Sequence, residues 1–183
     1  MAKSIVVFGD SISAGYGLEV QQGWVALLQK KLTGQYSQYS ISNESISGDT
    51  SAGGLARLEQ ALARHAPAVL LLELGGNDGL RGLSPVEMKK NLSEIVLKAQ
   101  KAGAKVLLLA MKIPPNYGKA YIEMFYNIYP QISAELQVPY VPFILEDVAL
   151  KPELMQADGL HPNALAQPIV AEKIWSYLMP LLN

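Results

Sequence analysis

The N-terminal stretch IVVFGDSISAGYG ends a short apolar run with a small residue, an acid and a serine, at Gly9, Asp10 and Ser11. An apolar run of this length is typical of a buried strand. The hydroxyl of Ser11 would then be exposed at the edge of a sheet, near the positive end of any helix that begins after it. A serine hydroxyl needs a neighbouring base to act as a nucleophile. The alternative is that Asp10 and Ser11 only cap that helix.

The chain has only two histidines that could serve as this base. His65 stands in the last turn of a predicted charged helix, where we interpret it as a solvated cation near the helix C-terminus. His161 lies in the loop QADGLHPN, three residues after Asp158. Around a turn, this spacing can set the carboxylate beside the imidazole and leave the other ring nitrogen free to take a proton from Ser11. The alternative is an ordinary surface turn.

A serine nucleophile also needs hydrogen-bond donors for the oxygen that becomes negative during the reaction. Gly48, in SISGDTSAGG, follows a second predicted strand, and a glycine there lets a backbone N–H approach a ligand closely. Asn77, in LELGGNDGLRG, follows a third strand, and its side-chain amide offers two donors. Turn chemistry alone also explains these residue types. Their joint position at successive strand ends favours a common site.

Apolar runs alternate with longer amphipathic segments along the whole chain. The runs predict strands at 4–9, 37–45, 68–75, 104–111 and 138–143, and the amphipathic segments predict helices at 23–34, 51–67, 84–103, 118–137 and 163–182. Ser84, Pro85 and Glu87 predict an N-cap, a first helical residue and a capping box. Pro130 predicts a break or kink in its helix.

This alternation predicts an α/β protein with a single domain over residues 1–183. We expect a three-layer α/β/α sandwich of flavodoxin-like architecture, with a mostly five-stranded parallel sheet. In such sheets, ligands bind beyond the carboxyl ends of the strands, which is where Ser11 falls.

Composition excludes several kinds of protein. The chain of 183 residues has a net charge of -1 and no basic block, so binding to nucleic acid through its phosphates is not expected. It has no cysteine, which excludes disulfides and thiol catalysis. It shows neither a G-x-S-x-G elbow, nor a phosphate-binding G-x-x-x-x-G-K-[ST] loop, nor an H-E-x-x-H zinc motif. No apolar run is long enough to cross a bilayer, so we expect no stable membrane insertion.

Four blocks of the sequence, in order, resemble the SGNH, or GDSL, hydrolases. They are FGDSIS with Ser11, SISGDTS with Gly48, LGGNDGL with Asn77, and DGLHPN with Asp158 and His161. The resemblance extends over nearly the whole chain. The segments ISGDTS, ELGGNDGLRG and PPNYGKAY are most similar to bacterial members that act as acyl-CoA thioesterase, arylesterase and lysophospholipase.

The resemblance implies a role for each of these residues. Ser11 would be the nucleophile, His161 the base and then the acid, and Asp158 the group that orients His161. The oxyanion hole would consist of the backbone N–H groups of Ser11 and Gly48 and the side chain of Asn77. The family implies no metal and no cofactor.

The substrate implied by the resemblance is a small acyl ester or thioester, and the chain is expected to act as a monomer. An acyl chain needs an apolar groove beside the serine, and the candidates for its lining are Leu80, Ile113, Pro114, Tyr117 and Phe125. The glycines around Asn77 suggest a loop able to move when substrate binds. No leader precedes the first predicted strand. We expect a periplasmic or secreted protein if a leader has been removed, and a cytoplasmic one otherwise.

Two other functions are compatible with the same residues. A carbohydrate O-deacetylase would use the same triad on an acetylated sugar, although the apolar segment around Ile113 argues against it. A non-enzymatic flavodoxin-like binding module would hold phosphate at its glycine-rich strand ends, with Ser11 as a helix cap.

Overall fold

The computed structural model describes residues 2–183 and contains one five-stranded parallel sheet in the order β2-β1-β3-β4-β5. The strands are β1 (Lys3–Gly9), β2 (Tyr39–Asn43), β3 (Val69–Glu73), β4 (Lys105–Leu109) and β5 (Tyr140–Val141). The α-helices are α1 (Ser11–Ala14), α2 (Trp24–Gln35), α3 (Ser51–His65), α4 (Gly76–Leu80), α5 (Pro85–Lys101), α6 (Lys119–Leu136) and α7 (Gln167–Leu178).

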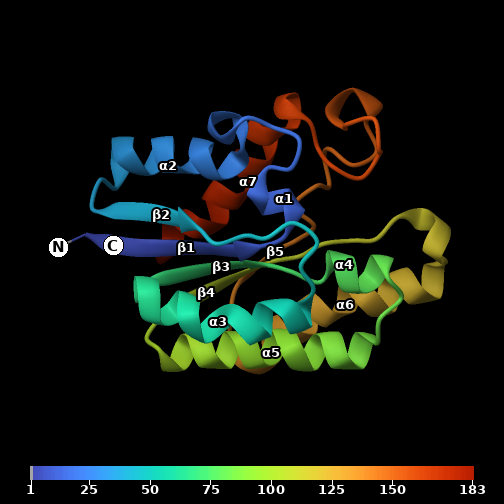
Figure 1. Cartoon of the computed structure of the whole chain (residues 1–183), viewed down its shortest axis with the longest axis horizontal. Coiled ribbons are helices and arrows are strands. Elements are labelled where there is room, and N and C mark those ends of the chain that lie inside the picture. Colours follow the sequence, from blue (N-terminus) through green and yellow to red (C-terminus); the bar gives the residue numbers. More distant parts are fainter. Residues whose placement is uncertain (1) are drawn as a thin grey trace.

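Helices cover both faces of the sheet, so the predicted three-layer α/β/α sandwich is confirmed. Helices α2 and α7 pack against each other on one face, and α3, α5 and α6 form the layer on the other (Figure 1). Crossover helices are the ordinary way to connect parallel strands, and they leave the central strands without a solvated face.

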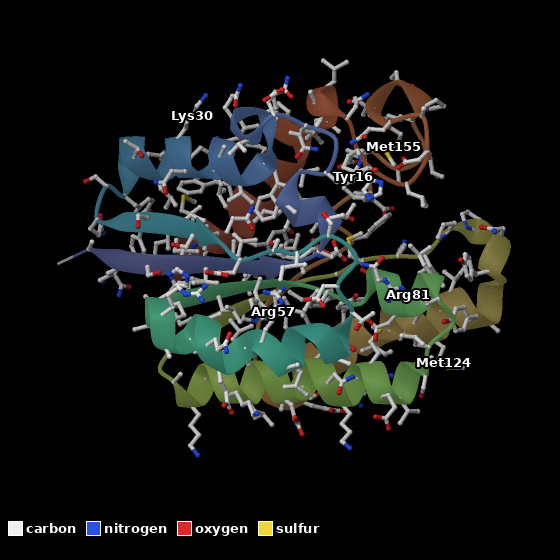
Figure 2. All side chains as sticks on the ribbon, in the orientation of Figure 1. Tyr16, Lys30, Arg57, Arg81, Met124 and Met155 are labelled. Atoms are coloured by element: carbon white, nitrogen blue, oxygen red, sulfur yellow. The ribbon has the colours of Figure 1, made fainter. Side chains whose placement is uncertain are left out.

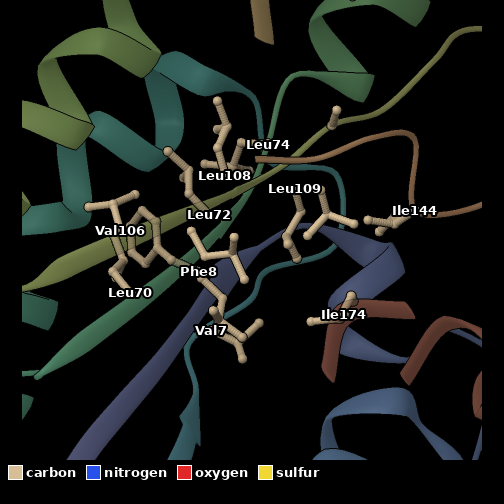
Figure 3. Close-up of a cluster of buried hydrophobic side chains, with 14 of the residues drawn as sticks. Val7, Phe8, Leu70, Leu72, Leu74, Val106, Leu108, Leu109, Ile144 and Ile174 are labelled. Carbon is tan, nitrogen blue, oxygen red and sulfur yellow. The ribbon is translucent and has the colours of Figure 1, made fainter. Parts of the chain in front are cut away.

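The two central strands are apolar on both faces for this reason. Residues 5–8 of β1 are fully buried, and every residue of β3 is buried. Their side chains pack together with those of β4, as the cluster around Phe8, Leu72 and Leu108 shows (Figure 3). The continuous apolar runs of the sequence therefore mark the strands at the middle of the sheet.

The strand order places the polar residues that follow these strands at one edge. Strand β1 lies between β2 and β3, so the chain leaves β1 in one direction and later returns on its other side. In sheets of this kind, ligands bind at the point where the order reverses. The segments after β1, β2 and β3 contain Ser11, Gly48 and Asn77 respectively.

Two predictions about helices need correction. The predicted break at Pro130 is absent, because α6 runs through this residue, whereas the alternative of a kink stays a prediction. Proline removes one backbone donor from the helix, but the buried face formed by Phe125, Ile128, Tyr129 and Ile132 keeps this segment packed on the core. At α5, the Ser84 hydroxyl accepts a hydrogen bond from the N–H of Glu87 as predicted, whereas no reciprocal bond from Glu87 is present among residues 2–183.

The glycines near Asn77 have a packing role that the sequence did not reveal. Gly75 has a φ of 115°, and a Cβ there would lie 2.4 Å from the hydroxyl of Tyr129. A Cβ at Gly79 would lie 2.5 Å from Ile113 and 2.7 Å from Phe125. We therefore attribute these two glycines to close packing of the turn after β3 against α6 and its preceding loop. The loop movement expected from composition stays a prediction.

Replacing Gly75 by alanine should consequently lower the free energy of unfolding. The backbone of an alanine is strained at this positive φ. Its Cβ would also displace the Tyr129 hydroxyl, which donates to the Leu74 carbonyl at 2.8 Å. We expect a loss of about 1–3 kcal/mol, measured by urea denaturation.

Gly34→Ala is the matched control, because a Cβ at this position of α2 meets nothing within 4 Å. It should leave stability unchanged or raise it by up to about 1 kcal/mol. Equal stability of the two variants would contradict the packing role of Gly75.

Candidate active site

Ser11 is the first residue of the short helix α1, directly after β1. Asp10 is the N-cap, and its Oδ1 accepts a hydrogen bond from the N–H of Ile12 at 3.0 Å. The helix ends after one turn at Gly15, whose φ is 76°. The cap expected as the alternative therefore exists, but Asp10 provides it. The Ser11 hydroxyl remains available for another contact.

That contact is with His161. The Ser11 Oγ lies 2.9 Å from Nε2 of His161, a hydrogen bond between residues 150 positions apart in the chain. The other ring nitrogen, Nδ1, lies 2.5 Å from Oδ2 of Asp158. A proton on Nδ1 satisfies Asp158, which leaves the lone pair of Nε2 facing the hydroxyl of Ser11.

Asp158 is fixed by its own loop. Its Oδ1 accepts hydrogen bonds from the backbone N–H groups of Leu160, at 2.9 Å, and His161, at 3.0 Å. The bonds from the backbone and ring of His161, together with that from Leu160, lower the pKa of Asp158 to about 2. The carboxylate is thus ionised at neutral pH and able to stabilise a positive charge on the imidazole.

The segments that contain Gly48 and Asn77 are joined by hydrogen bonds at the edge of the sheet. Gly48 has a φ of 83°, and its carbonyl accepts a hydrogen bond from Nη2 of Arg81 at 2.7 Å. The Asn77 amide donates to the Asp49 carbonyl at 2.9 Å and makes a longer contact of 3.4 Å with Asp10 Oδ2. Asn77 therefore connects the segment that contains Gly48 with the segment that contains Ser11. Within residues 2–183, the backbone N–H groups of Ser11 and Gly48 have no hydrogen-bond partner.

A cavity of about 530 Å³ begins at these residues, with Ser11, Asn77 and His161 among its lining. The rest of the lining is mainly apolar and includes Leu80, Met111, Ile113, Pro114, Ile122, Phe143, Leu145, Leu150 and Leu160. Pockets for small organic ligands have this size and this character. The site therefore combines a polar end with an apolar chamber.

The residues expected to line an apolar groove divide into two groups. Leu80, Ile113 and Pro114 line the cavity. Tyr117 does not, and its expected place in the lining needs correction: its hydroxyl donates to the Leu80 carbonyl at 2.9 Å. Phe125 is buried beneath Gly79 in the core. Both aromatic residues support the wall from behind.

The comparisons with known proteins agree with this arrangement. Residues 7–167 match the GDSL-like Lipase/Acylhydrolase family. The chain belongs to this family. It is 52% identical to the esterase TesA of Pseudomonas aeruginosa, over 99% of this chain and 90% of that protein. It is 46% identical to thioesterase 1/protease 1/lysophospholipase L1 of Escherichia coli K12, over 100% of this chain and 86% of that protein.

Solved structures give the same result for the fold. A crystal structure of TesA superposes with a TM-score of 0.96 at 52% identity, covering 98% of this chain and 100% of that chain. The esterase EstA from Pseudoalteromonas sp., in a structure inhibited by monoethylphosphonate, has a TM-score of 0.93 at 42% identity, covering 97% of both chains. The predictions of a GDSL-type fold and of an esterase are confirmed.

A buried pair of acids, Asp10 and Glu73, lies against the short helix α1 of this GDSL hydrolase, and sequence reasoning missed its second member. Glu73, the last residue of β3, is fully buried, and its Oε1 accepts hydrogen bonds from the N–H and hydroxyl of Ser13 at 3.1 and 2.6 Å. No N–H or O–H group of residues 2–183 donates a hydrogen bond to its Oε2. A lone glutamate within the apolar run AVLLLELG was the signal in the sequence.

Burial raises the pKa of both acids of this pair. Desolvation raises the pKa of Asp10 to about 6, although a hydrogen bond with Glu73 opposes the rise. Desolvation and the charge of Asp10 raise the pKa of Glu73 well above its usual value. We assign the shared proton to Glu73, which then donates to Asp10 and leaves Asp10 free to cap α1.

The second histidine was misinterpreted from the sequence. The side chain of His65 is not solvated, because its Nε2 lies 2.6 Å from Oε1 of Glu44 and only 17% of the side chain is exposed. Hydrogen bonds from His65 and Arg64 lower the pKa of Glu44. Glu44 follows β2 and packs against the last turn of α3, an arrangement that the helix pattern alone does not contain.

Among residues 2–183, no group of three or more His, Asp or Glu side chains could hold a metal ion. The helices of this part of the chain are also too short or too polar to cross a membrane.

The Asp10–Glu73 pair predicts a specific pH dependence of stability. Both pKa values are raised in the folded state, so the protonated pair contributes to the free energy of unfolding. This contribution is complete below the pKa values that the two acids have in the unfolded chain, and it is lost as pH rises through their pKa values in the folded protein. Glu73→Gln keeps a hydrogen-bonding side chain but cannot ionise. It should therefore become more stable relative to wild type as pH rises from 5 to 8, in denaturant titrations at several pH values.

Glu87→Gln in α5 removes an exposed acid and serves as the control. The relative stability of that variant should not follow the same trend. If the free energy of unfolding of Glu73→Gln does not rise relative to that of wild type as pH increases, the assignment of the shared proton to Glu73 is wrong.

Proposed function

We propose that the protein hydrolyses acyl esters and thioesters through an acyl-enzyme on Ser11. The observation on which this depends most is the continuous line of hydrogen bonds from Ser11 Oγ to His161 Nε2, at 2.9 Å, and from His161 Nδ1 to Asp158, at 2.5 Å. Such a line supplies a nucleophile with its base and supplies the base with a charge that stabilises its protonated form.

In the first step, Ser11 Oγ attacks the carbonyl carbon of the substrate while its proton moves to Nε2 of His161. The carbonyl electron pair shifts onto oxygen, and this oxyanion accepts hydrogen bonds from the N–H groups of Ser11 and Gly48 and from the Asn77 amide. The two backbone donors have no other partner within residues 2–183. The contact of Asn77 with Asp10, at 3.4 Å, is long enough to be exchanged for a shorter bond to the substrate.

The oxyanion then collapses and breaks the bond to the alcohol or thiol, which leaves with the proton from His161. A water molecule gives a proton to the same Nε2 and attacks the acyl group on Ser11. Collapse of this second intermediate releases the carboxylic acid and returns the proton to Ser11.

The cavity favours an acyl chain as the part of the substrate that is bound. Leu80, Ile113 and Pro114 form an apolar wall beside Ser11, where an acyl chain loses contact with water. The names of the similar proteins, esterase, arylesterase and thioesterase/lysophospholipase, fit substrates in which an acyl group is joined to either an alcohol or a thiol. An acetylated sugar would find few polar partners in this chamber.

The whole described chain takes part in this activity as one domain. We propose that it acts as a monomer on small acyl esters or thioesters, without nucleic acid, metal or organic cofactor.

Removing the hydroxyl of Ser11 tests this proposal. Ser11→Ala should lower kcat for p-nitrophenyl acyl esters and for acyl-CoA by about 10⁴-fold or more, with the unfolding midpoint near that of wild type. Ser40→Ala changes an exposed serine near the far end of β2 and should keep full activity. Wild-type turnover by Ser11→Ala would rule out the acyl-enzyme.

The role of Asn77 is tested separately. Asn77→Ala removes one oxyanion donor and should lower kcat by about 10²–10³-fold with little change in KM. Steady-state kinetics on one acyl ester decide the matter. An unchanged kcat with a raised KM would make Asn77 a residue of substrate binding only.

A further inference from the structure

The motif AGYG, which follows Ser11 after one helical turn, has no role in the reaction as described so far. Its residues lie against the loop that contains His161, and the contact involves both a hydrogen bond and an aromatic ring. We propose that Tyr16 and Gln156 are positioning residues that hold the His161 imidazole against the Ser11 hydroxyl. This inference rests on the proposed roles of Ser11 and His161 in catalysis.

Gln156 connects the two segments through one amide group. Its Nε2 donates to the carbonyl of Tyr16 at 2.8 Å and to the carbonyl of Pro162, the residue after His161, at 3.0 Å. The backbone N–H of Gln156 donates to the carbonyl of His161 at 2.8 Å. The histidine is therefore held on both sides by a residue that is itself bound to the chain just beyond Ser11.

The close approach of this amide requires Gly17. A Cβ on Gly17 would lie 2.3 Å from Oε1 of Gln156, and Gly17 has a φ of 78°. A side chain at position 17 would therefore push the amide away from the two carbonyls. The glycine of the motif is thus explained by Gln156 as well as by its own backbone conformation.

The ring of Tyr16 covers one face of the imidazole. The two ring centroids lie 4.5 Å apart with an angle of 38° between the planes. Figure 2 shows Tyr16 near Met155, the neighbour of Gln156, where the chain beyond α1 meets the His161 loop. Tyr16 remains 53% exposed, and its hydroxyl makes no hydrogen bond within residues 2–183, so the ring is the part in contact.

The ring limits the directions in which the imidazole can tilt away from Ser11. The charged groups that face His161 are Asp158 on its own loop and Asp10 at the end of β1. Substitutions at Tyr16 and Gln156 leave both acids in place. A loss of kcat in these variants therefore reports the position of the imidazole and not a missing charge.

The first experiment measures kcat and KM for three variants. Gln156→Ala should lower kcat about 10–100-fold with KM nearly unchanged, because a small displacement of the base costs rate without affecting the acyl cavity. Tyr16→Leu should also lower kcat with KM nearly unchanged, because the imidazole loses the ring that covers one of its faces. Tyr16→Phe keeps the ring and should restore the wild-type kcat.

A second pair of variants tests the role of Gln156 without changing it. Gly17→Ala introduces a Cβ against the Gln156 amide, whereas Gly15→Ala has a similar positive φ of 76° but meets nothing within 4 Å. The two should lose similar stability, and Gly17→Ala should lose at least about tenfold more kcat. This comparison decides the role of Gln156 even if Gln156→Ala does not fold.

Equal kcat values for Gly15→Ala and Gly17→Ala, or a wild-type kcat for Gln156→Ala, would overturn the role of Gln156. A wild-type kcat for Tyr16→Leu, or a loss of kcat in Tyr16→Phe as large as that in Tyr16→Leu, would overturn the role of Tyr16. In each case an inactive Ser11→Ala variant leaves the proposed function standing, whereas an active one refutes that function itself.

Discussion

The hydrogen bond between Ser11 and His161 is the contact on which the site depends, and it joins two segments with no local reason to meet. Ser11 is placed by β1, an interior strand of the sheet whose residues 5–8 are fully buried, so its position is fixed by the apolar core. His161 lies on a loop between β5 and α7, so its position depends on polar contacts within that loop and across to Ser11. The apolar core and the polar loop must therefore place the Ser11 and His161 side chains within hydrogen-bond distance of each other.

The edge of the sheet around Ser11 is held by groups that each bind more than one segment. The guanidinium of Arg57 donates to the carbonyl of Gly9 at 3.2 Å, to the carbonyl of Glu44, and to the carboxylate of Asp49 at 2.7 Å. It thus joins the ends of β1 and β2 to the loop that contains Gly48. Buried polar groups are costly unless they are hydrogen-bonded, and a group that satisfies three partners also fixes their relative positions. The donors that we propose for the oxyanion are in this way arranged before any substrate arrives.

Some residues of the site could be predicted from the sequence, and others could not. Ser11 was predictable because a nucleophile after a buried strand has only one edge of a parallel sheet to occupy, and His161 because Asp158 stands within one turn of it. Glu73 was missed because an acid within an apolar strand does not reveal which residue shares its proton. Tyr117 was misplaced because an apolar segment does not tell which of its side chains face a cavity and which support it from behind. These last two depend on packing between distant elements, which local patterns do not encode.

The central claim is that Ser11 is activated by His161 in the folded protein, and covalent labelling tests it most directly. The folded enzyme would be treated with an organophosphonate ester and then analysed by intact-mass and peptide mass spectrometry. The account predicts one phosphonyl group per chain, attached to Ser11, and labelling slowed by several orders of magnitude in His161→Ala. Stoichiometric labelling of another residue, or labelling of Ser11 at the same rate without His161, would contradict it.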